Sequence, residues 1–249
     1  IGKKVENQNL NKLTLLTVHG MDYNLDDEEK FNRFIDKIKP FASFYGSKHL
    51  LVKTDAYQIY SKYKVNTKIS HIGHIFALAG CGFLYSGYYK NIIIAADYRL
   101  DQQFLVSPWG SNSATNFLFD DGVTSLITKN DDIARSEKLE WIASSNIALE
   151  SSTFCSEKKN RPNNCGVCSK CTRTKLMFLA ATGSIPNIFL DMKMHKNAPI
   201  LKVSTKSSKN TFLLDLYFCA KNNNRLDLIP GLVKSINRIK KLDRFGLLK

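Results

Sequence analysis

The sequence contains no run of 18 or more apolar residues, and its first twelve residues are polar, without a hydrophobic signal core. A membrane-spanning helix needs about 20 consecutive apolar residues, and a secretory leader needs an apolar centre. We therefore expect a soluble, cytoplasmic protein that does not enter a membrane. Internal repeats and low-complexity tracts are also absent. The 249 residues, 43% of them hydrophobic, suffice for a full core in one large domain or in one domain with an appendage.

Acidic residues are scarce relative to basic ones. The chain has 22 Asp and Glu residues against 36 Lys and Arg residues, which gives a formal net charge of +14. Such an excess favours a polyanionic substrate or partner, including an RNA contact, although a lysine-rich surface also occurs without one. The sequence leaves the oligomeric state open, a homodimer included.

Only six cysteines are present, but four of them fall in one short stretch with the spacing C-x9-C-x2-C-x2-C. Two intervening residues let a tight turn aim two sulfurs at one point, and Zn²⁺ accepts four thiolates at the corners of a tetrahedron. Asn163, Asn164 and Gly166 are residue types that tolerate the left-handed turns of a metal knuckle. The pattern predicts a zinc knuckle over residues 155–171 with four ligands: Cys155, Cys165, Cys168 and Cys171.

Two other chemistries use the same cysteine pattern. Disulfides staple short secreted domains, whereas the length and apolar content of this chain favour zinc. An iron–sulfur cluster is the second alternative, since C-x2-C-x2-C also occurs in cluster proteins. Four protein ligands leave zinc no open position, so we expect a structural ion and no catalytic role for it. Cys81 and Cys219 are expected to be small core residues.

Apolar runs alternate with helical patterns along residues 13–141. We expect strands at 13–18, 49–53, 91–96 and 122–127, and helices at 26–41, at 70–89 and from Thr128 or Asn130 to Trp141. This alternation predicts an α/β fold with an open parallel sheet and helices on both faces. The helix at 70–89 is rich in small residues and should pack closely on the sheet.

Ligands of such sheets bind outside the carboxyl ends of the strands, so the residues that follow each strand are candidates. Asp22 follows the first strand, Thr54 and Asp55 the second, and Asp97 the third. A long loop, 99–121, comes next and presents Trp109 and Ser111, while His71 and His74 lie near the start of a helix. The alternative for the aspartates is a cap or turn, and for the histidines a structural role in the core.

The order of these elements, with Thr128-Lys129 opening a helix and a cysteine cluster before Arg173, resembles the N-type ATP pyrophosphatase superfamily over about residues 10–180. Its zinc-bearing members include the 7-cyano-7-deazaguanine synthases of queuosine precursor synthesis. The resemblance implies an adenine nucleotide alpha hydrolase-like fold and an ATP-dependent adenylation. An oxygen of a small acid would attack the α-phosphate of ATP, Mg²⁺ would neutralise the phosphates, and a nucleophile such as ammonia would then displace AMP.

The same resemblance implies roles for individual residues. The adenine would lie against the ends of two strands, and the acid would bind at the loops that follow them. The residues are Asp22 and Asp97 in catalysis, Val18 and Ala95 at the nucleotide, and His71, His74, Trp109 and Ser111 at the substrate.

One motif of the superfamily is missing: its pyrophosphate loop, Ser-Gly-Gly-x-Asp-Ser, does not occur in this sequence. The loop should come just before the first strand, yet only twelve residues precede Leu13. Either the chain begins downstream of the loop, or it is a member that has lost ATP chemistry. We favour the first, since loss of the strand before the loop would expose apolar edges in the middle of the sheet. Residues 1–249 alone are then expected to show no ATP–pyrophosphate exchange.

The predicted organisation is an ATP-pyrophosphatase-like domain at 1–184, including the knuckle, and a C-terminal extension at 185–249 of unassigned role. A basic amphipathic helix is expected from Pro230 to Lys249. Three function classes follow: an adenylate-forming enzyme acting on a small acid, a tRNA-modifying relative favoured by the charge, and a zinc-stapled binding protein without catalysis.

Overall fold

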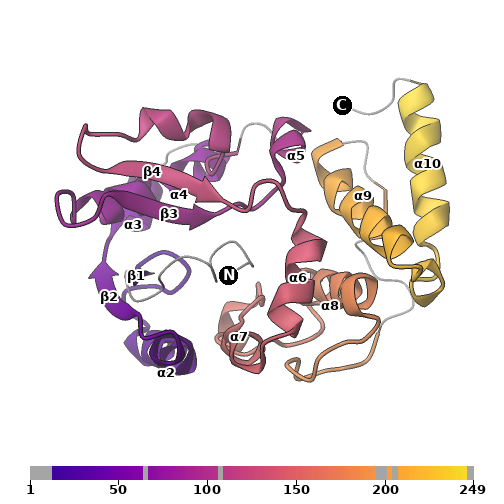
Figure 1. The fold of residues 1–249 in the computed structure, drawn as a ribbon, viewed down its shortest axis with the longest axis horizontal. Coiled ribbons are helices and arrows are strands. Elements are labelled where there is room, and N and C mark those ends of the chain that lie inside the picture. The colour runs from indigo at the N-terminus through magenta and orange to yellow at the C-terminus, as the bar shows by residue number, and fades with distance from the viewer. Residues whose placement is uncertain (1–12, 64–66, 106–108, 195–200, 204–206, 246–249) are drawn as a thin grey trace. The chain divides into compact units, whose positions relative to one another are not determined.

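The computed structural model describes residues 13–63, 67–105, 109–194, 201–203 and 207–245. The chain divides into two compact units, one ending at Ile133 and the other beginning at Ala134 (Figure 1). The sequence analysis places a boundary at residue 184 instead. In the structure, helices on both sides of residue 184 share one hydrophobic core, so the knuckle groups with the C-terminal segment.

The described residues of the N-terminal unit form four short strands in two parallel pairs. Strand β1 (Thr14–His19) pairs with β2 (Lys48–Lys53), and β3 (Asn91–Ala95) pairs with β4 (Ser125–Lys129). The registers run from Thr14 opposite Lys48 and from Asn91 opposite Ser125. The fold class is therefore mixed α/β with small parallel sheets, while the described residues form two two-stranded sheets rather than one open sheet.

Helices connect these strands. Helix α2 (Glu28–Phe44) lies between β1 and β2, and carries Glu28 and Glu29 at its positive end. Helices α3 (Ala56–Lys62) and α4 (Thr67–Phe83) lie between β2 and β3. Helix α5 (Leu100–Leu105) and the 3₁₀ helix η2 (Ser113–Leu118) lie between β3 and β4. Two of these helices lie where the sequence pattern predicts a helix (α2 and α4), and three lie where it does not (α3, α5 and η2).

Helix α4 packs closely on β3, and its small residues allow that approach. A β-carbon built on Gly82 would lie 2.8 Å from the Ile92 side chain, so a larger residue would push the helix away. Ile75 and Ala79 of α4 form a buried cluster with Leu126 of β4. The prediction of a tightly packed, small-residue helix is confirmed, although the helix ends at Phe83 and not at Tyr89.

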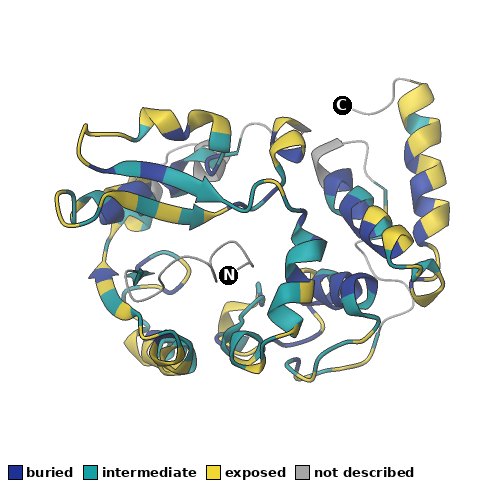
Figure 2. Cartoon of the chain, viewed as in Figure 1, coloured by how far each residue is buried: buried dark blue, intermediate teal, exposed yellow. Residues whose placement is uncertain are grey.

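The C-terminal unit is a set of helices around one core. Its elements are α6 (Arg135–Ala143), α7 (Asn146–Ser151), η3 (Lys158–Asn160), α8 (Ser169–Thr182), α9 (Ser207–Asn222), η5 (Leu226–Leu228) and α10 (Leu232–Arg244). Helix α8 is buried along most of its length, whereas α10 has one buried and one exposed face (Figure 2). Gly183 ends α8 in the left-handed conformation with φ of 82°, as expected of a glycine at that position.

The expected start of the helix after β4 is wrong. Neither Thr128 nor Asn130 caps it, because β4 continues through Lys129 and Asn130 takes a left-handed turn with φ of 60°. The backbone carbonyl of Asp131 instead accepts a hydrogen bond from Leu100 N at 2.7 Å. Helix α6 begins at Arg135, where Glu137 accepts a hydrogen bond from Ala134 N at 3.0 Å.

Within the described ranges, no helix combines the length and apolarity needed to cross a membrane.

Candidate metal centre and polar cluster

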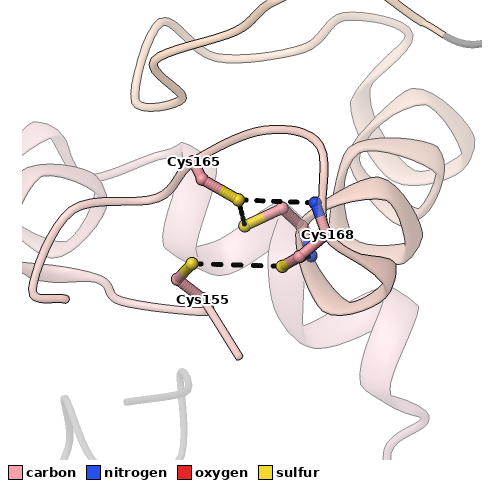
Figure 3. A group of neighbouring side chains, drawn as sticks. Cys155, Cys165 and Cys168 are labelled. Atoms are coloured by element: carbon pink, nitrogen blue, oxygen red, sulfur yellow. Dashed lines mark hydrogen bonds between the residues drawn. The ribbon is translucent and has the colours of Figure 1, made fainter. Parts of the chain in front are cut away.

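The four predicted ligands converge in the C-terminal unit. The sulfurs of Cys155, Cys165, Cys168 and Cys171 all lie within 4.8 Å of one another. Cys155 Sγ lies 4.0 Å from Cys168 Sγ, and Cys165 Sγ lies 3.9 Å from Cys171 Sγ (Figure 3). Zn–S bonds of about 2.3 Å at tetrahedral angles would place the sulfurs about 3.8 Å apart. The four cysteines can therefore hold a metal ion of that size.

The start of α8 positions two of these sulfurs. Cys168 is the N-cap residue of the helix, and its Sγ accepts a hydrogen bond from Cys171 N at 3.4 Å. Cys165 Sγ accepts a hydrogen bond from Cys168 N at 3.3 Å. Backbone N–H groups at a helix N-terminus favour negative charge, so this end of α8 stabilises thiolates.

Gly166 makes the turn between Cys165 and Cys168 possible. Its φ is +81°, and a β-carbon there would lie 2.0 Å from the carbonyl oxygen of Asp191. Asp191 N in turn donates to Cys165 O at 3.3 Å. The segment around Asp191 thus lies directly against the knuckle, and only glycine fits between them.

Asn164 has a different role from the one predicted. It is buried, with 1% of its surface exposed, and its side chain joins three segments of backbone. Its Oδ1 accepts from Phe154 N at 2.6 Å, while Nδ2 donates to Ser152 O at 3.2 Å and to Ile188 O at 3.3 Å. The sequence shows two adjacent Asn residues shortly before Gly166, residue types that favour a turn, and gives no signal that the Asn164 amide would be enclosed.

The thiols of the cluster do not form disulfides, since all six cysteines are free and buried. Burial opposes ionisation of Cys168, but hydrogen bonds from Ser156 and from Cys171 N outweigh it and lower its pKa to about 6. Burial raises the pKa of Cys155 and that of Cys171. A divalent ion would reverse these last two shifts, because metal binding requires deprotonated ligands.

A second group of predicted residues converges at the carboxyl end of β3, in the N-terminal unit. Ser111 Oγ donates to Asp97 Oδ2 at 3.0 Å, and Trp109 Nε1 lies 3.1 Å from Asp97 Oδ2 and 2.9 Å from Ser111 Oγ. His74 of α4 completes the group, with Nε2 3.3 Å from Ser111 Oγ and its ring centroid 5.2 Å from that of Trp109. We call Asp97, Trp109, Ser111 and His74 the polar cluster.

The loop that carries Trp109 and Ser111 is held in place by its neighbours. A β-carbon on Gly110 would lie 2.4 Å from Ile72 O, so the loop rests on the backbone of α4. Fully buried Gln103 accepts from Ser113 N at 2.7 Å and donates to Tyr98 O at 3.1 Å. The bridging role of Gln103 is not predicted, because the sequence places this residue in the long loop at 99–121 without a signal that its side chain is buried.

The arrangement of the polar cluster favours recognition over nucleophilic attack. In a nucleophilic triad the acid orients the histidine and the histidine activates the hydroxyl. Here Asp97 and His74 both contact the Ser111 hydroxyl, so the hydroxyl is held between them. A half-buried indole beside a fixed carboxylate and hydroxyl suits a small ligand with an apolar body and polar edges.

Three other predicted site residues lie at or near the ends of β1 and β3. Asp22 lies in the turn after β1, and Val18 is opposite Val52 within the β1–β2 pair. Ala95 is exposed at the end of β3, opposite Lys129. The side chain of His71 lies outside the described residues.

An open surface depression of about 440 Å³ lies between the carboxyl end of β2 and the turn after β1. Its lining includes Leu25 from the turn that carries Asp22, together with Lys53, Thr54 and Asp55. Gly20 approaches Thr54 so closely that a β-carbon would lie 1.8 Å from Thr54 O, which keeps the two strand ends together. The depression and the polar cluster thus lie at the carboxyl ends of β2 and β3, the position at which parallel α/β folds bind ligands.

Comparison with protein-family models, with curated proteins and with solved structures finds no match to this chain.

Proposed function

We propose that the protein is an ATP-dependent, adenylate-forming enzyme that activates a small acid, with the acid bound at the polar cluster. The observation that carries the proposal is the convergence of Asp97, Trp109, Ser111 and His74. These residues come from three separate segments of chain and meet at the carboxyl end of a parallel strand, where α/β folds bind ligands.

In this reaction an oxygen of the acid attacks the α-phosphate of ATP and pyrophosphate leaves. The Ser111 hydroxyl and the indole N–H, which contact Asp97 in the structure, would turn to the carboxyl group of the acid, while His74 and the indole ring enclose its body. Val18 and Ala95 would lie beside the adenine. Mg²⁺ would neutralise the phosphates, and the chemistry needs no covalent bond to the protein.

The two inner strands, β1 and β3, each have one described partner, and α4 contacts both of them. A further parallel strand between them would join the pairs into one open sheet, and a glycine-rich loop after that strand would hold the pyrophosphate. We propose that the phosphate site requires such a strand in addition to residues 13–133. The split of the sheet supports this arrangement.

The cysteine cluster is proposed to hold one structural Zn²⁺. Cys155 would anchor the loop after α7 to the start of α8 through the ion. With four thiolates bound, the ion offers no site for water or substrate, so it supplies stability and not catalysis.

The acid site can be tested with Trp109 as a reporter. Trp109 and Trp141 are the two tryptophans of the chain, so Trp141→Phe leaves Trp109 alone. Its fluorescence is recorded during titration with a panel of carboxylic acids, with and without Mg·ATP. At least one acid is expected to change the emission, and Asp97→Asn to weaken that response about tenfold or more.

The matched control is Asp120→Asn, which alters a carboxylate of the same unit that bonds Ser125 Oγ at 2.5 Å, outside the polar cluster. It should leave the titration unchanged. No response to any acid, or equal responses in the Asp97→Asn and Asp120→Asn proteins, would contradict the assignment of the site.

Catalysis is tested by ATP–pyrophosphate exchange. Residues 1–249 contain no glycine-rich turn that follows a strand, so we expect no exchange from them alone. Exchange that depends on the acid is expected when a strand ending in a glycine-rich phosphate loop is fused before them. Exchange by residues 1–249 alone would show that another site holds the pyrophosphate.

A second candidate function, tRNA modification, is favoured by the exposed face of α10. Lys234, Arg238 and Lys241 lie at successive turns of this face, and all three are exposed. A gel shift with tRNA at increasing salt tests this function. Replacing the three residues by Gln should weaken binding and reduce the salt slope by about one per residue. The control replaces Lys39, Lys48 and Lys90, three exposed lysines of the other unit.

A further inference from the structure

Lys175 is a fully buried lysine beside the cysteine cluster. It has 0% of its surface exposed and is the largest side chain enclosed to that degree among the described residues. It lies on α8 four residues after Cys171, and residues at this spacing share one face of a helix. Its ammonium group therefore extends from the same side of α8 as the Cys171 sulfur.

The described contacts of the ammonium group do not balance its charge. Lys175 Nζ donates one hydrogen bond, to Lys193 O at 3.1 Å, and lies 5.5 Å from the centroid of the Phe189 ring. In the described parts of the chain, no ion pair within 4.0 Å joins Lys175 to a carboxylate. A buried charge is costly unless an opposite charge compensates it, so an anion should lie near.

Three groups act electrostatically on Lys175. Burial lowers the pKa of its ammonium group, while the charges of Asp191, Cys171 and Cys165 oppose that shift. Asp191 is half-buried, and its Oδ1 accepts a hydrogen bond from Lys193 N at 2.7 Å. Cys165 and Cys171 are buried with Lys175, so less solvent screens their charge.

We propose that Lys175 is the buried countercharge of a tetrathiolate metal centre, a positioning residue that stabilises the ligands in their ionised, metal-bound form. Zn²⁺ with four thiolates carries a net charge of about −2, which a protein interior must offset. The N-terminus of α8 offsets part of it, and Lys175 supplies a full positive charge on the same helix. This inference rests on the zinc centre proposed above.

The test compares metal retention in Lys175→Met and in the wild-type protein. Met keeps the length and the apolar stem of Lys but lacks the charge. Zinc content is measured first, and the rate of zinc transfer to a coloured chelator is then followed. We expect Lys175→Met to release zinc about 10- to 100-fold faster, the range typical when a group behind the metal ligands is lost. Lys175→Arg, which keeps the charge, should recover most of the retention.

A double-mutant cycle separates charge from packing. Cys155→His changes the centre to three thiolates and one neutral imidazole. The negative charge of the centre then falls in magnitude from about −2 to about −1. Cys155→His also leaves both N–H···S bonds of the knuckle intact, since those involve Cys165 and Cys168. The effect of Lys175→Met should be several-fold smaller in this background. In an Asp191→Asn background, by contrast, the effect should persist.

The outcomes distinguish the two proposals. Wild-type protein without zinc would overturn the metal centre itself. A zinc-loaded wild type whose release rate is unchanged by Lys175→Met would overturn only the role of Lys175, as would an effect equally large in the Cys155→His background. An effect that disappears with Asp191→Asn would make Asp191, and not the metal centre, the anionic partner of Lys175, and would overturn the proposed role. If Lys175→Met folds only together with Cys155→His, the charge role is supported, and failure to fold in both backgrounds would contradict it.

Discussion

Gly166 lies directly against the backbone of Asp191, where a β-carbon would come within 2.0 Å of the Asp191 carbonyl oxygen. The same residue has a φ of +81° and connects two of the four clustered cysteines. A single residue without a side chain thus lets the knuckle close against the segment that follows α8.

Gly166→Ala should disrupt the knuckle, because it adds a backbone clash to an unfavourable φ. Gly231→Ala in the same unit is the matched control, since Gly231 has a φ of +87° with nothing within 4 Å of its added β-carbon. We expect Gly231→Ala to lower the free energy of unfolding by about 1 kcal/mol and Gly166→Ala by about 3 kcal/mol or more. Urea denaturation measures both, and equal losses would show that the close approach to Asp191 has no cost.

Asn164→Ala tests the buried amide that joins three backbone segments. It removes three hydrogen bonds and leaves Phe154 N, Ser152 O and Ile188 O without that partner. The expected loss is about 3 kcal/mol in the free energy of unfolding, since each buried unsatisfied group costs about 1 kcal/mol or more. The neighbouring Asn163 is exposed, so Asn163→Ala should change stability by less than about 0.5 kcal/mol. Similar losses for the two variants would contradict the bridging role.

Asp215 gives the C-terminal unit a pH dependence of unusual sign for an aspartate. It is 4% exposed, burial raises its pKa, and its Oδ2 accepts from Ser136 N at 3.2 Å. The folded protein then holds a proton that the unfolded chain loses above about pH 4, so stability falls as pH rises from there through the folded pKa. Asp215→Asn can accept the same bond and cannot ionise.

The wild-type protein should therefore lose stability relative to Asp215→Asn as pH rises above about 4. Urea denaturation of both proteins between about pH 4 and pH 8 gives the difference curve. If the difference in the free energy of unfolding between the two proteins does not change with pH, or if the wild type gains stability relative to Asp215→Asn as pH rises, Asp215 is not held in its neutral form.

Trp109→Ala should lower ligand affinity far more than stability. The indole is half-buried at a loop and donates to Asp97 and Ser111, so it contributes little to the main core. Calorimetric titration with the acid found in the fluorescence screen should show at least a tenfold loss, about 1.4 kcal/mol. Phe117→Ala, which removes a 75% exposed ring in the same unit, should leave binding unchanged. Unfolding of Trp109→Ala with intact binding in the remaining folded fraction would make Trp109 a packing residue.

Strands and the metal cluster follow from local patterns, and the sequence analysis finds them. The run from Leu13 to Val18 predicts β1 to within one residue, because a β-branched apolar run has few alternatives. The cysteine spacing predicts the cluster because two-residue gaps constrain geometry directly. Trp109, Ser111 and Asp97 are expected near one another because loops at the carboxyl ends of parallel strands lie at the same edge of a sheet. His74 is expected at the same site only from the resemblance to the N-type ATP pyrophosphatase superfamily.

Features set by tertiary contacts escaped the sequence analysis. The local sequence does not distinguish an exposed Asn in a turn from a buried Asn whose side chain bonds the backbone, as that of Asn164 does. The predicted start of α6 is wrong because Thr128 and Asn130 match the residue types of a cap, while Thr128 belongs to β4 and Asn130 forms a left-handed turn. Lys175 carried one usable signal, its spacing of four from Cys171 within a helix of mostly buried residues. The join between α8 and α9 depends on a shared core, which sequence position does not reveal.

Elemental analysis of the purified protein decides whether the four clustered cysteines of the C-terminal unit hold the proposed zinc ion. We predict close to one zinc and no iron per chain. Cys168→Ser should lose the metal and cost several kcal/mol of stability, while the buried non-ligand variant Cys81→Ser keeps the metal. Metal-free wild-type protein with four titratable thiols in the cluster and a melting temperature that does not respond to a chelator would contradict the claim.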